Sequence, residues 1–168
     1  MEYVMANEQY LKQMRAQFDL LDEDEQAAPE NLYLYQPMRA EYDARFGGRK
    51  EHRAIAALFR RAREKLGDEG ITDGYYMMAL ADTLERMDKQ LYEHYRALED
   101  LLLEAARKAV CSPGVQAQYA LMKAVRLNLL DPEKYLPAVR AAFEKTRCTP
   151  GTADFYRLAQ EEYRRSAL

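Results

Sequence analysis

Two kinds of helical pattern alternate along this chain, and this alternation constrains the fold more than any other feature. Residues 90–110 carry a single apolar stripe at three- and four-residue spacing, which indicates a helix with one buried face. Residues 72–87 and 113–130 are apolar nearly all round, so helices there must be covered on several sides. No stretch alternates apolar and polar residues as a half-buried strand does. The sequence therefore predicts an all-α protein.

A tyrosine recurs at a similar place in each of the four more apolar segments. The four are Tyr33, Tyr76, Tyr119 and Tyr156, spaced by 43, 43 and 37 residues. A repeat of this length with two helices in it is typical of an array of helical hairpins, in which inner helices are wrapped by outer ones. An irregular helical bundle with chance spacings is the alternative.

Glycine and proline mark the ends of the predicted helices. "CSPG", "LLDPEK" and "CTPGT" each place a capping residue before a proline, with Ser112, Asp131 and Thr149 as the expected caps. Pro37 is expected to kink or restart its helix after Gln36. Eight helices are predicted, near residues 2–22, 30–46, 49–66, 72–87, 90–110, 113–130, 133–147 and 151–165.

Size and composition indicate one soluble domain over residues 1–168. Apolar residues make up 48%, charged residues 32% and the net charge is −3, which gives no sign of a nucleic-acid partner. We see neither a signal peptide nor a membrane span and expect a cytoplasmic protein. Cys111 and Cys148 are then expected to be reduced, with one disulfide as the alternative. His52 and His94 have no metal-ligand spacing and are interpreted as helix-surface residues.

Three stretches resemble, in order, the unsaturated rhamnogalacturonyl hydrolases, which remove a 4,5-unsaturated uronic acid from pectin fragments. Residues 73–109 ("DGYYMMALADTLERMDKQLYEHYRALEDLLLEAARKA") resemble one inner–outer hairpin of that family, and residues 119–144 resemble its next hairpin. "ENLYLYQPMRAEYDARFGG", residues 30–48, is similar to the segment with the catalytic carboxylate. The resemblance implies an α/α barrel of six hairpins without metal or organic cofactor. This chain offers four hairpins, hence a shortened α/α toroid or an open arch.

The resemblance also implies site residues. In the family an Asp protonates the double bond of the unsaturated sugar, water adds, and the resulting hemiketal falls apart. Glu30 stands at the place of that acid, and Tyr33, Asp73 and Tyr75 stand at substrate-binding places. The sequence departs from the family pattern, because Glu replaces Asp, Ile71 stands near an expected Arg, and the loops between hairpins are short.

These residues also have a purely structural interpretation. Glu30 follows Pro29 and suits the first turn of a helix, where a carboxylate favours the positive end of the dipole. Asp73, Ser112 and Thr152 suit helix caps. The tyrosines recur at core spacing and suit packing, and the chain has 13 tyrosines but no tryptophan to offer a sugar.

The sequence favours a loop-stripped, non-catalytic helical scaffold related to that family. Its Ala-, Glu- and Arg-rich helix surfaces are also typical of an engineered or designed sequence. One alternative is a residual glycoside hydrolase acting on an unsaturated uronyl oligosaccharide through Glu30. A second alternative is a helical-repeat module that binds a protein on its concave face. A symmetric homodimer could cover inner-helix surface that four hairpins leave exposed.

Overall fold

The structure, a computed structural model, describes residues 7–167. Those residues form helices and no strand, which confirms the all-α prediction. The helices of the described part are α1 (Glu8–Asp19), α2 (Glu23–Ala27), α3 (Pro29–Arg45), α4 (His52–Gly70), α5 (Gly74–Arg86), α6 (Tyr92–Ala109), α7 (Val115–Arg126), α8 (Pro132–Lys145) and α9 (Ala153–Arg165).

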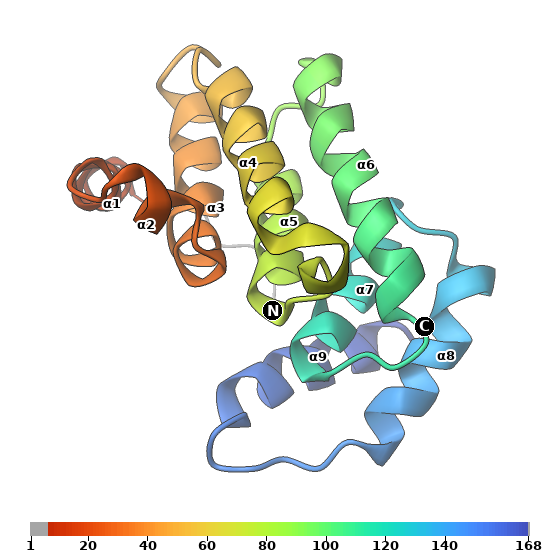
Figure 1. The fold of residues 1–168 in the computed structure, drawn as a ribbon. Coiled ribbons are helices and arrows are strands. Elements are labelled where there is room, and N and C mark those ends of the chain that lie inside the picture. The colour runs from red at the N-terminus through yellow and green to blue at the C-terminus, as the bar shows by residue number, and fades with distance from the viewer. Residues whose placement is uncertain (1–6, 168) are drawn as a thin grey trace.

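The helices form two layers, as the alternation in the sequence predicts. In the inner row, α5 packs between α3 and α7, and α9 packs on the other side of α7. The helices between them in sequence form the outer layer, and Figure 1 shows α4 and α6 side by side in front of α5. Within the described residues, α3 and α9 do not pack against each other as neighbouring inner helices do. The inner row is therefore an open arch.

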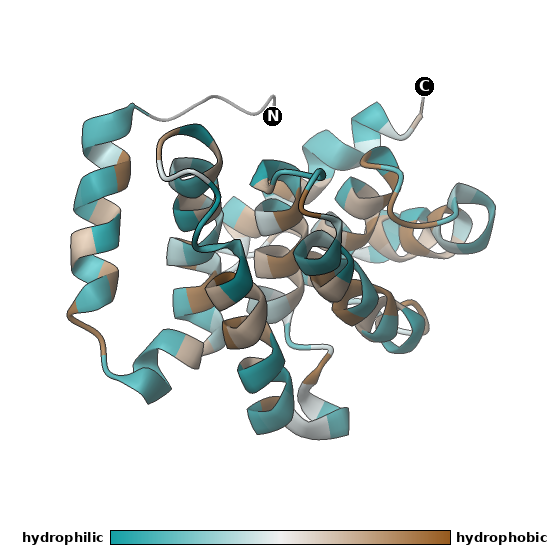
Figure 2. Ribbon diagram, turned by 90° about the horizontal axis from the view of Figure 1, so that it is seen from above, coloured by the Kyte–Doolittle hydropathy of each residue, from teal (hydrophilic) through white to brown (hydrophobic). Residues whose placement is uncertain are grey.

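The inner helices α5 and α7 carry most of the core, because other helices cover them on several sides. Residues 76–84 of α5 and 117–124 of α7 are buried without a break. The outer helix α6 instead buries one stripe, which includes Leu98 and Leu102. In Figure 2 the hydrophobic residues gather in the middle of the array, and hydrophilic residues cover its outside. The two helical patterns in the sequence thus correspond to the two layers.

The first helix is shorter than its predicted range of 2–22, of which residues 2–6 lie outside the described part. α1 ends at Asp19, and a separate short helix α2 begins after Asp22. The Asp22 side chain accepts a hydrogen bond from the Glu25 N–H, and the Glu25 side chain accepts one from the Asp22 N–H. This capping box starts a new helix where the sequence analysis continued the old one.

Of the three expected caps before a proline, only one is confirmed. Asp131 caps α8 and accepts a hydrogen bond from the Glu133 N–H at 3.0 Å. Ser112 is wrong as a cap, because α7 begins at Val115 and the Gln118 side chain binds the carbonyl of Pro113 at 2.9 Å. Thr149 is wrong too, because α9 begins at Ala153 and Thr152 takes the cap position. The Thr152 side chain hydrogen-bonds Thr149 and caps no helix N–H.

Pro37 does not restart α3, which continues through it from Pro29 to Arg45. The proline lacks one N–H, so one hydrogen bond of the helix is lost. Pro37 is buried, and α1, α4 and α5 all pack against α3. This tertiary packing holds the helix together where the local sequence favours a break.

His52 is fully buried, so the prediction of a surface position is wrong. Its Nδ1 lies 2.5 Å from the Asp43 carboxylate, and its Nε2 accepts a hydrogen bond from the Asp88 N–H at 3.0 Å. These bonds tie the end of α3 to the start of α4 and to the turn after α5. His94 is half-buried on α6.

The two cysteines, Cys111 and Cys148, are exposed and form no disulfide, in agreement with the expectation of reduced thiols.

Candidate functional site

The structure gathers an aromatic row from three inner helices. The rings of Tyr33 on α3 and Tyr75 on α5 have centroids 5.9 Å apart at an angle of 48°. Phe155 on α9 also meets Tyr75 edge-on, with ring centroids 5.5 Å apart. Burial, together with the charge of Asp82, raises the pKa of Tyr33 to about 12. Two of the predicted substrate-binding residues, Tyr33 and Tyr75, therefore lie together.

Asp73 is the N-cap of α5, two residues before Tyr75. Its Oδ1 accepts a hydrogen bond from the Tyr76 N–H at 3.0 Å, which confirms the capping interpretation. Gly74 follows in the first turn and lies against the Gln116 side chain of α7. Asp73 therefore holds the start of α5 and, through it, the position of the Tyr75 ring.

Glu30 is exposed on the first turn of α3, directly after Pro29 at the start of the helix. An acidic side chain there favours the positive end of the helix dipole. It precedes Tyr33 by three residues, which is close to one helical turn. A general acid must lie within hydrogen-bond reach of the group that it protonates. The Glu30 side chain is instead open to solvent on the outside of this first turn.

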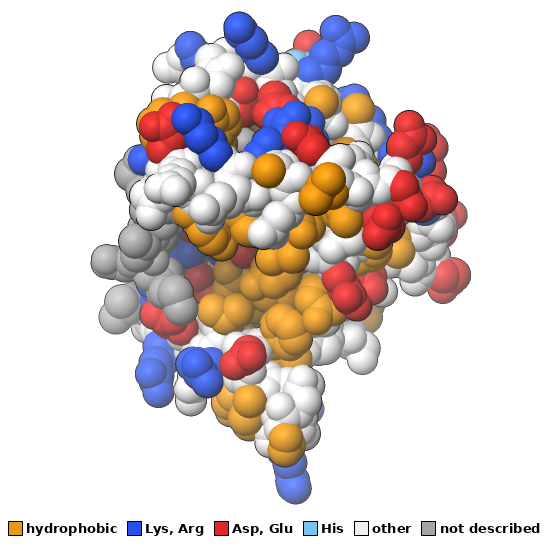
Figure 3. Space-filling view, turned by 90° about the vertical axis from the view of Figure 1, so that its left-hand side faces the viewer, with side chains coloured by type: hydrophobic (Ala, Val, Ile, Leu, Met, Phe, Trp, Pro, Cys, Tyr) orange, Lys and Arg blue, Asp and Glu red, His pale blue; other side chains and the backbone are white. Residues whose placement is uncertain are grey.

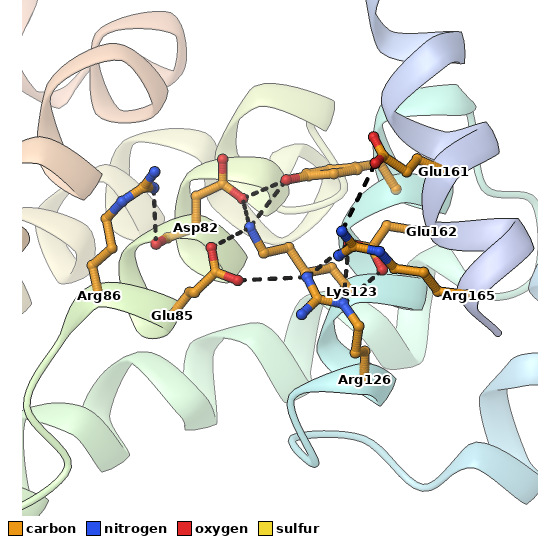
Figure 4. A network of polar contacts seen from close by, with 9 residues as sticks. Asp82, Glu85, Arg86, Lys123, Arg126, Glu161, Glu162 and Arg165 are labelled. Carbon is orange, nitrogen blue, oxygen red and sulfur yellow. Dashed lines mark hydrogen bonds and ion pairs between the residues drawn. The ribbon is translucent and has the colours of Figure 1, made fainter. Parts of the chain in front are cut away.

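Buried charged groups link α5 to α7, in a network that Figure 4 shows. The Oδ1 atom of Asp82 accepts hydrogen bonds from the Tyr119 hydroxyl at 2.7 Å and from the Lys123 Nζ at 2.6 Å. Lys123 also lies 2.9 Å from the Glu85 carboxylate. The Lys123 side chain is only 6% exposed, so one buried cation joins two carboxylates of the neighbouring helix.

The network continues from α7 to α9. Arg126 donates from Nε and Nη2 to the Glu162 carboxylate, at 2.9 and 2.8 Å, in the bidentate geometry that makes such pairs strong. Its Nη2 also lies 3.5 Å from Glu85. Arg165 adds ion pairs with Glu161 and Glu162 at 3.8 and 3.7 Å. Acidic and basic groups thus alternate across three inner helices (Figure 4).

The charges in this network determine how its groups titrate. Burial alone would raise the pKa of Glu85, but Lys123, Arg86 and Arg126 together outweigh burial and lower it. Burial and the Asp82 carboxylate raise the pKa of Tyr119, so its phenol keeps the proton that it donates to Asp82. The hydrogen bond to Glu162 raises the pKa of Arg126. Glu85 is therefore held as a carboxylate and is a poor proton donor at neutral pH.

A pocket of about 220 Å³ opens beside the network, between α1, α3 and α5. Asp82 and Arg86 form its polar wall. Its apolar wall includes Tyr33 and two exposed side chains, Tyr10 and Leu34, which are 44% and 49% exposed. Figure 3 shows hydrophobic side chains gathered in a hollow on the side of the molecule where α1 and α3 lie, with charged side chains around it.

Sequence reasoning singled out Tyr119 as a recurring tyrosine but missed every charged residue of the network. A signal was present, because Asp82 and Lys123 are 41 residues apart, as are Glu85 and Arg126. That separation is close to the repeat of about 40 residues between inner helices. Opposite charges one repeat apart could therefore have been paired across α5 and α7 before the structure was known.

The described residues, 7–167, contain no cluster of three or more His, Cys, Asp or Glu side chains that could hold a metal ion. Within the same range, no helix has the length and apolar character needed to cross a membrane. Comparison of the chain with known protein families, curated proteins and solved structures found no match. The resemblance to the unsaturated rhamnogalacturonyl hydrolases therefore stays a prediction.

Proposed function

We propose that this chain is a non-catalytic helical-hairpin scaffold. The observation that carries the proposal is the contrast between Glu30 and the carboxylates of α5 and α9. Glu30, at the place of the expected acid, is exposed on a first turn. Three carboxylates of α5 and α9 are instead bound to cations, Asp82 and Glu85 to Lys123, and Glu162 to Arg126. These ion pairs tie neighbouring inner helices together, and the pKa of Glu85 is lowered by the cations beside it, so Glu85 supports helix packing and not proton donation.

The aromatic row favours a second function, the binding of an unsaturated uronyl oligosaccharide without turnover. Tyr33, Tyr75 and Phe155 offer adjacent aromatic faces from three helices. Sugars stack their apolar C–H faces on such rings, and Asp82 and Arg86 lie beside Tyr33 to meet hydroxyl groups. Asp73 would act here by positioning Tyr75.

One titration with an unsaturated uronyl disaccharide tests both statements. The ultraviolet absorbance of its conjugated double bond reports turnover, and tyrosine fluorescence reports binding in a chain that has no tryptophan. We expect no loss of absorbance that depends on the protein. A loss that Glu30→Gln abolishes would instead establish the residual hydrolase and reject the scaffold.

Binding is tested by the fluorescence signal of the same titration. If the aromatic row holds the sugar, a saturable change is lost in Tyr75→Ala and kept in Tyr92→Ala, which removes an exposed tyrosine from the outer helix α6. An unchanged signal at all sugar concentrations would leave the scaffold function alone. The homodimer and the cytoplasmic location stay predictions.

A further inference from the structure

Two connections between helices meet at one end of the array, the α3–α4 connection at residues 46–51 and the α5–α6 connection at residues 87–91 (Figure 1). His52, at the start of α4, is fully buried there. Its Nε2 accepts a hydrogen bond from the Asp88 N–H at 3.0 Å. A ring nitrogen that accepts carries no proton, so the ring is neutral and its proton is on Nδ1, which faces the Asp43 carboxylate at 2.5 Å.

The Asp43 carboxylate is fully buried and lacks a cation among the described residues. Within residues 7–167 its hydrogen bonds come from neutral donors, the Glu51 N–H at 2.8 Å and the His52 ring. Its Oδ1 is buried without a hydrogen-bond partner in the same range. Because a buried carboxylate is costly without a cation beside it, Asp43 favours a protonated His52.

Asp88 favours the neutral ring instead. A protonated His52 would carry a hydrogen on Nε2 that faces the Asp88 N–H, so two donors would meet without an acceptor. The α5–α6 connection has to move before such a ring fits. The Asp88 carboxylate holds this connection through Arg49 at 2.9 Å and the Gln90 N–H at 2.8 Å. Arg49 is 42% exposed, and an ion pair with so exposed a group contributes little free energy.

We propose that His52 is a pH-sensitive switch, which closes this end of the array at neutral pH and opens it in mild acid. When the ring gains its second proton, the imidazolium stays with Asp43 and releases the Asp88 N–H. The α5–α6 connection then turns, and the Asp88 carboxylate leaves Arg49 and accepts the new Nε2–H. The switch acts on the fold itself and depends on neither the scaffold nor the sugar-binding proposal.

The charged groups around the ring come from each neighbouring segment. Asp43 faces it from α3, and Asp88 faces it from the α5–α6 connection, with Arg49 bound to Asp88. On α4 itself, the carboxylate of the preceding Glu51 pairs with Arg15 and Arg39. α6 also packs against α4, but their ion pair lies further along, between Arg63 and Glu104. The two carboxylates that contact His52 directly therefore decide its protonation.

Hydrogen exchange of the Asp88 amide between pH 7 and pH 5 tests the proposal, because histidines titrate in this range and most carboxyl groups do so below it. Opening coupled to the uptake of one proton changes its equilibrium up to tenfold per pH unit. We expect the protection factor of the Asp88 amide to fall at least about tenfold. The Met77 amide, bonded to the Asp73 carbonyl at the other end of α5, is the internal control and should stay within about twofold.

His52→Gln should abolish this dependence on pH, because the amide oxygen can still accept from Asp88 but the side chain does not titrate. His94→Gln is the matched control on α6 and should keep the dependence. The proposal is overturned if the Asp88 protection factor does not change with pH, or if the change persists in His52→Gln.

Two further variants decide the matter even if His52→Gln does not fold. Asp88→Asn keeps the N–H but removes the charge that accepts the new proton, so the midpoint of the opening should move about half a pH unit lower. Arg49→Asn frees the Asp88 carboxylate and should move the midpoint higher by a similar amount. Asn also suits the left-handed backbone of residue 49, where φ is 63°. A merely structural role of His52 would not produce opposite shifts, and shifts in the same direction contradict the switch.

Discussion

At the scale of single residues, Gly74 lets the first turns of α5 and α7 pack closely against each other. A Cβ atom on Gly74 would lie 2.1 Å from the Gln116 Oε1 and 2.6 Å from the Gln116 Cβ, which is closer than atoms can approach. The Gln116 Cβ is attached to the backbone of α7, so it cannot swing away. We expect Gly74→Ala to lower the free energy of unfolding by about 1–3 kcal/mol through overpacking.

Urea denaturation measures this loss, and Gly151→Ala is the matched control. A Cβ on Gly151 would meet no atom within 4 Å, so that variant should keep nearly the full stability. Equal stability of the two variants would contradict the close packing of α5 and α7 at their first turns.

At the scale of elements, the N-termini of the helices show where local sequence signals agree with the structure and where they do not. Asp131 and Ser112 both stand before a proline, yet only Asp131 caps a helix. Asp131→Ala should cost about 1 kcal/mol, because the N-terminal N–H of Glu133 loses its acceptor. Ser112→Ala should change the midpoint of thermal unfolding very little. Circular dichroism during heating compares the two, and a similar loss in both would place the start of α7 at Pro113 after all.

At the scale of the whole molecule, Lys123 joins the middle of the arch. Lys123→Met leaves Asp82 and Glu85 buried without their cation, so we expect a loss of about 3–5 kcal/mol at neutral pH. The pKa of Glu85 is lowered in the folded state, so its contribution is present above its unfolded pKa. That contribution disappears as the pH falls through the lower folded pKa. The difference between Lys123→Met and the parent should therefore shrink below about pH 4.

Urea denaturation at neutral and at acidic pH tests this dependence. Lys65→Met is the control, since Lys65 pairs with the exposed Asp24 at the surface and should show little change at either pH. A loss for Lys123→Met that is independent of pH would show that packing of the lysine chain, and not its charge, holds α5 to α7.

The predictions from sequence succeeded where short-range patterns decide the outcome. The buried and striped helices and the Asp131 cap depend on residues within one or two turns of each other, and the inner–outer order follows from the alternation of the two helix types along the chain. The failures depend on contacts between distant segments. In the sequence His52 resembles a polar residue at a helix start. In the structure it is buried, where it bonds the Asp43 carboxylate and the Asp88 N–H. Pro37 reads as a break until three neighbouring helices pack around α3.

The candidate site shows the same division. Tyr33 and Tyr75 were grouped from sequence through the family resemblance, and the structure places their rings in contact. Phe155 and the charged network of α5, α7 and α9 were not found.

The sequence by itself determined an all-α chain with two kinds of helix in alternation, since the 3.6-residue period of a helix is written in consecutive residues. Only the tertiary structure decided which polar side chains turn inward and meet. That choice depends on the register of one inner helix against the next, to within about one residue along a rise of about 1.5 Å. Lys123 reaches both Asp82 and Glu85 because α5 and α7 pack in that one register.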